Sequence, residues 1–424
     1  MRTPSVPSNH RSPLTILFIC VFVDMIGYGM VVPLLPFLAP EGSARALLVG
    51  LLSSLYALLQ FLAAPVLGAL SDRVGRRPVL IGAVLASSAA YSVLSLGASI
   101  GALPLVFLAV ALGGAAGASI PTAQACIADR LPPAERARGL GLIGAAFGLG
   151  LMLGPASGGL LSVYGLGVPP LLAATLALLN GLFALRALPE SLPPERRAPT
   201  PLRPAGAARQ LGAAFALRDA RPLLVAIFLL NMAFAGLQSN APLFTSTRFG
   251  WGPLENGAFF AFIGACAVLT QGVILGRLLS HLAEARLVSG GLGLMALTLG
   301  GAALAPAGWM LYPLVGAMAL GIGLAAPSIT SLVSRLAGEG RQGAVMGGMQ
   351  AVLSLTLILG PALAGVLFDT FGPGAPYLGG GTLALGALGA ALVGLAPAGR
   401  AAPAAADECD SGFRILDFGF LAPR

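Results

Sequence analysis

Long apolar runs, separated by short turns rich in arginine, glycine and proline, make up most of this chain. A helix needs about 20 predominantly apolar residues to cross the hydrocarbon core of a bilayer, and the runs are close to that length or longer. The alternating strand pattern of a membrane barrel is not seen. The pattern therefore predicts an all-α membrane protein with twelve spans, near residues 14–38, 47–70, 79–98, 104–128, 139–163, 169–188, 223–247, 256–279, 287–305, 310–334, 342–368 and 376–397.

The arginines give these spans an orientation. The chain has 24 basic residues, all of them arginine, and short cytoplasmic loops are enriched in basic residues. With the N-terminus in the cytoplasm, only Arg45 and Arg248 fall on the opposite side. We therefore predict a multi-pass protein of a bacterial-type cell (inner) membrane with both termini cytoplasmic. The first run is too long for a signal peptide, so we expect it to be retained as a span.

The composition excludes several other classes of protein. Hydrophobic residues make up 57% of the chain and charged residues 9%, whereas soluble domains contain about 25% charged residues. The net charge of +8 does not indicate nucleic-acid binding, because the arginines occupy short loops between spans. Cys20, Cys126 and Cys266 lie inside apolar runs and Cys409 lies in the tail, a spacing that predicts no disulfide framework, metal site or cofactor.

The chain divides into two similar halves around a polar segment rich in proline and arginine. The Gly154-Pro155 pair of the fifth span recurs as Gly360-Pro361 in the eleventh. We predict an N-terminal six-helix bundle (1–188), a cytoplasmic linker (189–222), a C-terminal six-helix bundle (223–397) and a disordered cytoplasmic tail (398–424). Two parallel repeats of this kind leave a cavity between them at mid-depth, which opens to alternate sides when one half moves against the other.

Asp24 is the acidic residue that lies deepest in a predicted span. A carboxylate at this depth costs about 2.5–3.5 kcal/mol on insertion scales, so a function that offsets the cost is expected. A group that alternates between charged and neutral forms in a switching cavity can couple proton movement to substrate movement. The alternative is a carboxyl that only hydrogen-bonds a neighbouring helix.

Polar side chains in other spans are candidates for the wall of the cavity. Asn231 and Gln238 are two helical turns apart and share a face, and Gln350 and Ser354 are one turn apart. The full set of candidates is Tyr28, Gln60, Gln124, Asn231, Gln238, Asn240, Gln271, Gln350 and Ser354. For any single residue, hydrogen bonding between helices of one bundle is an equally good explanation.

The fifth predicted span carries small residues at every fourth position from Ala146 to Gly158. Such a face lets helices pack closely in lipid. The candidate motif on this span comprises Gly150, Gly154, Pro155, Gly158 and Gly159. Close packing with no role in transport explains this face equally well.

The turn between the second and third spans is the other motif. Its candidate residues are Gly68, Asp72, Arg73, Gly75, Arg76 and Arg77, together with Asp129 at the end of the fourth span. Glycine permits tight turns and close backbone approach, and an acid such as Asp72 is favourable near a helix N-terminus. We expect Arg76 to pair with Asp129, and these contacts to hold the cytoplasmic side closed. A simple topology signal would need the arginines but neither Asp72 nor the glycines.

These motifs resemble those of the drug/proton antiporter branch of the major facilitator superfamily, and most closely the tetracycline-exporter group. Residues 68–77 are similar to the family's loop signature, and residues 150–159 are similar to its fifth-span antiporter signature. The first-span pattern is represented by Asp24, Gly27, Gly29, Pro33 and Pro36. The resemblance covers roughly residues 14–397. It implies a secondary active exporter of a small amphipathic or drug-like compound in exchange for protons, and we expect a monomer in the lipid bilayer.

Two positions depart from the family pattern. Ala109 stands where the family usually has an arginine in the fourth span, so that proton coupling either rests on Asp24 alone or is altered. Ala267 stands near the place where tetracycline exporters have a histidine, and the histidines of this chain, His10 and His281, lie outside the predicted spans. The resemblance therefore leaves the substrate open.

A symporter or facilitator for a sugar-like or other small metabolite is the nearest alternative, since fold alone does not fix function. A sugar transporter more often has several aromatic and charged residues in its spans. An intramembrane enzyme would need a nucleophile with a base, or metal ligands, at depth. No such grouping stands out in the sequence, so we predict a transporter and not an enzyme.

Overall fold

The computed structural model describes residues 11–42, 44–117, 119–197, 212, 215–337 and 342–395. Within them, twelve helical segments are long and apolar enough to cross a membrane, which confirms the predicted number of spans. Helices make up nearly all of the described chain and no strand occurs in it, so the all-α fold is confirmed. The predicted tail and much of the predicted linker lie outside the described residues.

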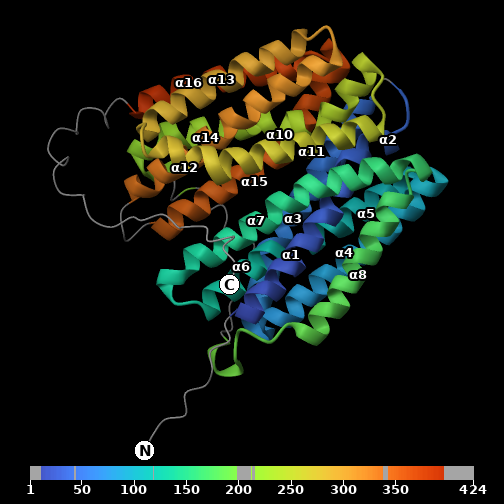
Figure 1. Ribbon diagram of the computed structural model, residues 1–424, viewed down its shortest axis with the longest axis vertical. Helices are drawn as coiled ribbons and strands as arrows, with labels where there is room; N and C mark the ends of the chain where they lie inside the picture. Colours follow the sequence, from blue (N-terminus) through green and yellow to red (C-terminus); the bar gives the residue numbers. More distant parts are fainter. Residues whose placement is uncertain are drawn as a thin grey trace, which may run out of the picture.

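The first six spans form the N-terminal half, in the lower part of Figure 1. They are α1 (Arg11–Val31) with η1 (Val32–Leu34) and α2 (Leu35–Leu38), α3 (Arg45–Val74), α4 (Arg76–Ile100), α5 (Leu103–Ala116) with α6 (Ser119–Arg130), α7 (Pro133–Leu161) with η2 (Ser162–Tyr164), and α8 (Val168–Ala187). After α8 the chain makes a short turn, η3 (Pro194–Arg196).

The last six spans form the C-terminal half, in the upper part of Figure 1. They are α10 (Arg221–Phe249), preceded by η4 (Arg218–Ala220), α11 (Pro253–Leu269) with η5 (Thr270–Ile274) and α12 (Leu275–Leu279), α13 (Glu284–Leu304), α14 (Leu311–Ala337), preceded by η6 (Gly308–Met310), α15 (Gln342–Phe371) and α16 (Ala375–Leu395).

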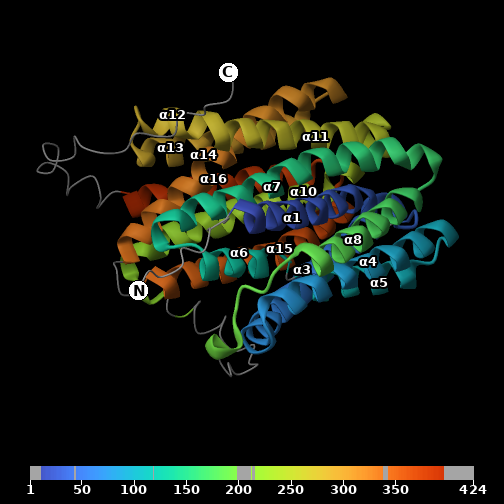
Figure 2. The ribbon, with the colours of Figure 1, turned by 60° about the horizontal axis from the view of Figure 1, so that its bottom comes forward.

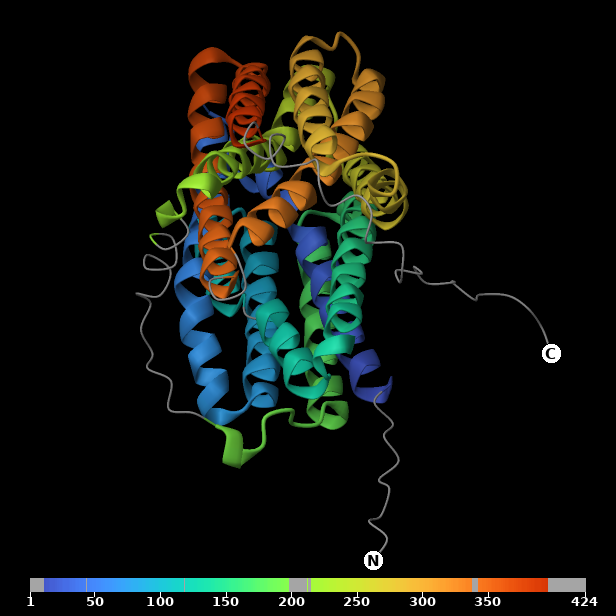
Figure 3. The ribbon, with the colours of Figure 1, turned by 90° about the vertical axis from the view of Figure 1, so that its left-hand side faces the viewer.

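The two halves have separate apolar cores. One cluster of buried side chains runs through the C-terminal half, around Leu224, Leu292 and Ile329. Two others lie in the N-terminal half, around Leu80 and Leu52. Figure 3 shows the same division as two groups of helices. We call the end of the bundles that carries Arg76 the inner end and the end that carries Arg45 the outer end.

Three predicted spans are interrupted helices. Pro33 lies in the 3-10 segment η1 at the end of the first span, because proline lacks the N–H that a continuing α-helix needs. The eighth span contains the π-helical segment η5. The fourth span breaks at Gly117, whose carbonyl oxygen accepts a hydrogen bond from Nε2 of Gln60 at 3.3 Å. That bond satisfies a backbone group at the break.

Candidate functional site

A cavity of about 130 Å³ lies between the halves. Most of its wall comes from the N-terminal half, and α10 and α15 contribute Gln238, Ser239 and Pro361 from the other half. Asp24 is part of this wall and is only 6% exposed. The acid singled out in the sequence therefore lies at the boundary of the two halves, facing a cavity and not the lipid.

Ser119 fixes the position of the Asp24 carboxyl. Its hydroxyl donates a hydrogen bond to Oδ2 of Asp24. Ser119 is the first residue of α6, and the break at Gly117 places this new helix start beside the acid. A helix N-terminus favours negative charge. Ala109 also lines the cavity, whose wall contains no charged side chain other than Asp24 among the described residues.

Three tyrosines stand around the same cavity. The rings of Tyr28 and Tyr56 are 5.6 Å apart between centroids, and Tyr91 packs over Gly27, where an added Cβ would lie 3.1 Å from Cε2 of Tyr91. Within the described part of the chain, no hydrogen bond engages these three hydroxyls. Of the three, only Tyr28 was a candidate from the sequence, because no local pattern shows that Tyr56 and Tyr91 approach the first span.

Of the predicted polar candidates, Tyr28, Gln60 and Gln238 line the cavity. The others do not lie in its wall, namely Gln124, Asn231, Asn240, Gln271, Gln350 and Ser354. For these six, a role in substrate binding stays a prediction that this cavity does not support.

Local contacts and exposure describe where these side chains lie. Nδ2 of Asn231 donates to the carbonyl oxygen of Ile227 in its own helix at 2.8 Å. Gln271 is exposed in the π-helical segment η5. Asn240 is fully buried, and neither atom of its amide has a hydrogen-bond partner in the described structure.

The three remaining candidates also lie outside the cavity wall. Gln124 and Gln350 are exposed. The hydroxyl of Ser354 donates to the main-chain oxygen of Gln350 at 3.0 Å. Neither Gln350 nor Ser354 lies in the wall of the cavity.

The glycines of α7 hold it against α1, its neighbour in the same half (Figure 2). A Cβ added to Gly154 would lie 2.7 Å from Cα of Gly29, and one added to Gly158 would lie 2.7 Å from the carbonyl oxygen of Met30. Gly150 is equally close to Met25. Any larger residue at these positions would push the two backbones apart.

A second face of α7 contacts α11 of the other half. A Cβ added to Gly159 would lie 2.8 Å from Cα of Gly257, and one added to Gly257 would lie 2.6 Å from the carbonyl oxygen of Pro155. Gly264 is similarly close to Met152, at 2.9 Å from its Cα. Through the glycines of the predicted motif, α7 thus packs against α1 of its own half and against α11 of the other half.

The outer end also brings α3 and α15 together, across the halves. A Cβ added to Gly365 would lie 2.8 Å from Cα of Leu47. Asp369, near the end of α15, accepts hydrogen bonds from the backbone N–H groups of Ala46 (3.2 Å) and Leu47 (2.8 Å). Ala44 has no side-chain cap at the start of α3, so Asp369 supplies one from the other half.

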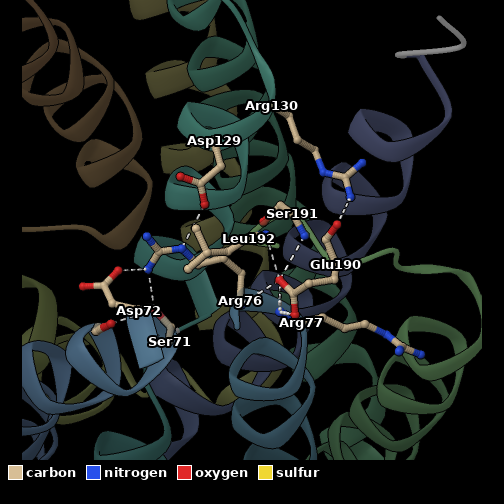
Figure 4. A network of polar contacts seen from close by, with 10 residues as sticks. Ser71, Asp72, Arg76, Arg77, Asp129, Arg130, Glu190, Ser191 and Leu192 are labelled. Carbon is tan, nitrogen blue, oxygen red and sulfur yellow. Dashed lines mark hydrogen bonds and ion pairs between the residues drawn. The ribbon is translucent and has the colours of Figure 1, made fainter. Parts of the chain in front are cut away.

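Arg76 is the centre of a polar network at the inner end (Figure 4). Its guanidinium contacts Oδ1 of Asp72 at 2.6 Å, Oδ2 of Asp129 at 3.0 Å and Oγ of Ser71 at 2.5 Å. The expected pairing of Arg76 with Asp129 is present. These partners all belong to α3 and α6, so the Arg76 contacts lie within one half. Their role in closing the cytoplasmic side stays a prediction.

Glu190 completes this network and was not identified from the sequence. Its carboxylate accepts hydrogen bonds from the backbone N–H groups of Arg76 (2.9 Å), Ser191 (2.9 Å) and Leu192 (3.0 Å), and so caps the start of α4. Partial burial alone would raise the pKa of Glu190, but the backbone donors outweigh it and hold the pKa below its ordinary value of 4.5. The guanidinium of Arg130 donates to the carbonyl oxygen of Glu190 at 2.8 Å.

The two turn glycines differ in what the structure requires of them. Gly75 has φ of +110°, and a Cβ there would collide with the Glu190 carboxylate. Gly68 is open, with no atom within 4 Å of an added Cβ. Arg73 lies exposed in the last turn of α3. The helix cap at Glu190 therefore explains Gly75, and nothing in this structure explains Gly68.

Comparison with known proteins identifies the family to which this architecture belongs. The family profile of the Major Facilitator Superfamily matches residues 17–352 and again residues 273–421. The chain belongs to the major facilitator superfamily. Its relatives include the class C tetracycline resistance protein of Escherichia coli, 33% identical over 361 residues that cover 84% of this chain and 90% of the relative. The resemblance to the tetracycline-exporter group is thereby confirmed.

Other relatives come from animals. Major facilitator superfamily domain-containing protein 10 of Mus musculus is 28% identical over 416 residues, covering 85% of this chain and 88% of the relative. The crystal structure of the human organic anion transporter MFSD10 (TETRAN) aligns with a TM-score of 0.69 and 25% identity, over 90% of this chain and 99% of that one. The protein is therefore a membrane transporter of this superfamily and not an enzyme.

Proposed function

We propose that this transporter exports a small amphipathic or drug-like compound in exchange for protons, by alternating access. The position of Asp24 carries the proposal: it is the charged side chain in the wall of a cavity to which both halves contribute. A carboxyl that faces such a cavity can release its proton when the cavity opens to one side and regain it from the other. Ser119 holds the carboxyl in place for both steps.

The contacts at the outer end support an alternating mechanism. α3 meets α15, and α7 meets α11, at backbone distances that leave no passage between those helices there. Opening the outer end requires both pairs to separate. With the arginine distribution placing the inner end in the cytoplasm, the structure corresponds to a state whose outer side is closed. The same distribution supports a cell-membrane location with both termini cytoplasmic.

The cavity wall supports a neutral or cationic substrate. It offers one carboxyl, three tyrosine rings and the amides of Gln60 and Gln238, and no basic side chain. Aromatic faces attract cations, and the phenol and amide groups can hydrogen-bond a polar portion of the substrate. An organic anion, the substrate class named for the human structural relative, would meet the Asp24 charge unfavourably.

A symporter or facilitator for a sugar-like or other small metabolite remains the second candidate. The three cavity tyrosines favour it, because aromatic residues in the spans were the feature expected of that class. The direction of coupling separates the two candidates. In everted vesicles acidified inside, an exchanger accumulates the substrate, whereas a symporter expels it.

The test is transport of a fluorescent amphipathic cation into everted vesicles by the Asp24→Asn variant. We expect the pH-gradient-dependent component to be lost, because the amide cannot carry a proton. Asp219→Asn, which changes an exposed acid beside the start of α10, should transport normally. Full pH-gradient-dependent transport by Asp24→Asn would exclude the role given to this residue.

A further inference from the structure

A second hollow, on the outside of the N-terminal half, has no part in the proposed transport cycle. It is a groove of about 550 Å³ between α4 and α8 at the inner end, and none of its residues lines the central cavity. Figure 1 shows α4 and α8 on the side of this half that faces away from the other half. α4 forms one wall, Leu185 of α8 lies opposite, and Arg77, Glu190 and Arg197 line the same groove.

The two arginines have unused hydrogen-bonding capacity. Nη2 of Arg77 donates to the carbonyl oxygen of Leu185 at 2.6 Å, but the Nε atoms of Arg77 and Arg197 are sealed from solvent and have no acceptor among the described residues. A buried charged donor without an acceptor is costly. Glu190 does not relieve either Nε, because its carboxylate is engaged by backbone N–H groups. Figure 4 shows Arg77 directed away from the Arg76 network.

The groove continues from this basic end along an apolar surface. Ile81, Gly82 and Leu85 follow Arg77 along α4, and Arg77 and Leu85 are about 12 Å apart at 1.5 Å rise per residue. On α8, Leu178, Leu182 and Leu185 form an exposed apolar stripe, 39–46% exposed. In a membrane-spanning helix, such a stripe faces acyl chains.

We propose that this groove binds an anionic phospholipid of the inner-end leaflet. On binding, the side chains of Arg77 and Arg197 turn toward the groove, so that their guanidinium groups, Nε included, donate to the phosphate, and an acyl chain lies along Ile81 and Leu85. Guanidinium matches phosphate in geometry as well as charge, and basic pockets between spans at the cytoplasmic side are suited to anionic head groups. A soluble phosphate would satisfy the arginines but leave the apolar part of the groove uncovered.

Lipid binding to the purified full-length protein tests the head-group contact. Native mass spectrometry would compare phosphatidylglycerol with phosphatidylcholine of the same acyl chains, with inorganic phosphate as a competitor. We expect phosphatidylglycerol to bind more tightly, and Arg77→Gln with Arg197→Gln to weaken it about tenfold or more. Arg186→Gln is the matched control, since it removes an exposed arginine from the same helix end outside the groove.

A steric pair of variants tests the acyl-chain contact without changing any charge. Gly82→Leu fills the groove, and the added side chain meets no protein atom within 4 Å at its Cβ. Gly290→Leu makes the same change at an equally open and exposed glycine, at the same position along α13. We expect Gly82→Leu to reduce phosphatidylglycerol binding and Gly290→Leu to leave it unchanged.

Four results would overturn the proposal. The first is equal binding of the two lipids to the wild-type protein. The second is an equal loss of binding in Arg186→Gln and the double arginine variant, which would indicate general charge attraction. The third is displacement of the lipid by inorganic phosphate at equal concentration, and the fourth is unchanged binding in Gly82→Leu. Either of these last two would show that no acyl chain occupies the groove.

Discussion

Replacing Asp369 by alanine should open the outer end. Asp369 holds the first turn of α3 through two backbone N–H groups, and it does so from the opposite half. Its carboxylate also lies close to the C-terminal end of its own helix, α15, where a negative charge is unfavourable. The contact with α3 therefore exists only while the two halves are together at this end, and its loss destabilises that state alone.

The size of the effect follows from helix capping. Removing a side-chain cap costs about 0.5–2 kcal/mol, and removing a negative charge from a helix N-terminus costs about 0.3–1 kcal/mol. We take about 1–2 kcal/mol for the sum, since part of the contact is exposed. This corresponds to about a 5–30-fold change in the ratio of the two states.

Distance measurements by pulsed electron paramagnetic resonance can detect such a change. Spin labels would replace Tyr164 and Trp309, which are exposed next to outer-end turns of the two halves. In Asp369→Ala, the population with the longer distance should increase. Glu41→Gln, which neutralises an exposed acid near the same end, should leave the distribution as in the wild type. An unchanged distribution in Asp369→Ala, or an equal shift in Glu41→Gln, would refute the reasoning.

Two further predictions concern α7 and the inner-end cap. Gly154→Leu should slow transport by at least about tenfold while retaining substrate binding, because it separates α7 from α1 by overpacking. Gly144→Leu, on the open face of α7, should transport normally. Equal transport rates of the two variants in vesicles would contradict this. Glu190→Gln should lower the free energy of unfolding by about 1 kcal/mol at pH 7, as for a lost helix cap, with Glu195→Gln as the exposed control. The pKa of Glu190 is lowered on folding. The wild type should therefore hold this stabilisation above pH 4.5 and lose it as the pH falls through the lower pKa of the folded state. The thermal unfolding curves of Glu190→Gln and the wild type should then converge in acid.

The sequence predicted those features that depend on local pattern. Span number follows from apolar length, and the Arg76–Asp129 pair follows from two charges placed at span ends that meet at the same side. The depth of Asp24 in its span was also readable, since its distance from the span ends is counted along one helix. In each case the physical constraint acts within one helix or at its ends.

The features that were missed depend on which helices are neighbours. Tyr56 and Tyr91 belong to different spans from Asp24, and only the packing of α3 and α4 brings them to the cavity. Glu190 and Asp369 act on the starts of helices remote in sequence. Glu190 lies close to the end of a span, but its position in the sequence did not indicate which helix it would cap.

Six of the nine polar candidates lie outside the cavity wall for a related reason. A buried amide or hydroxyl can be satisfied by the backbone of its own helix, as Asn231 is by Ile227. A sequence pattern that places a polar group in a span does not distinguish this from a group directed at a cavity. Only the side-chain directions in the folded protein make that distinction.

The break in the fourth span has a mechanical consequence. Because α6 is separate from α5, it is a short rod of about 15 Å between Ser119 and Asp129, with a polar partner at each end. A shift of α6 along its axis that lengthens the Ser119–Asp24 hydrogen bond also moves Asp129 relative to Arg76. Events at mid-membrane and at the membrane surface are thus joined by one rigid piece, while α5 keeps its packing against α3 and α4.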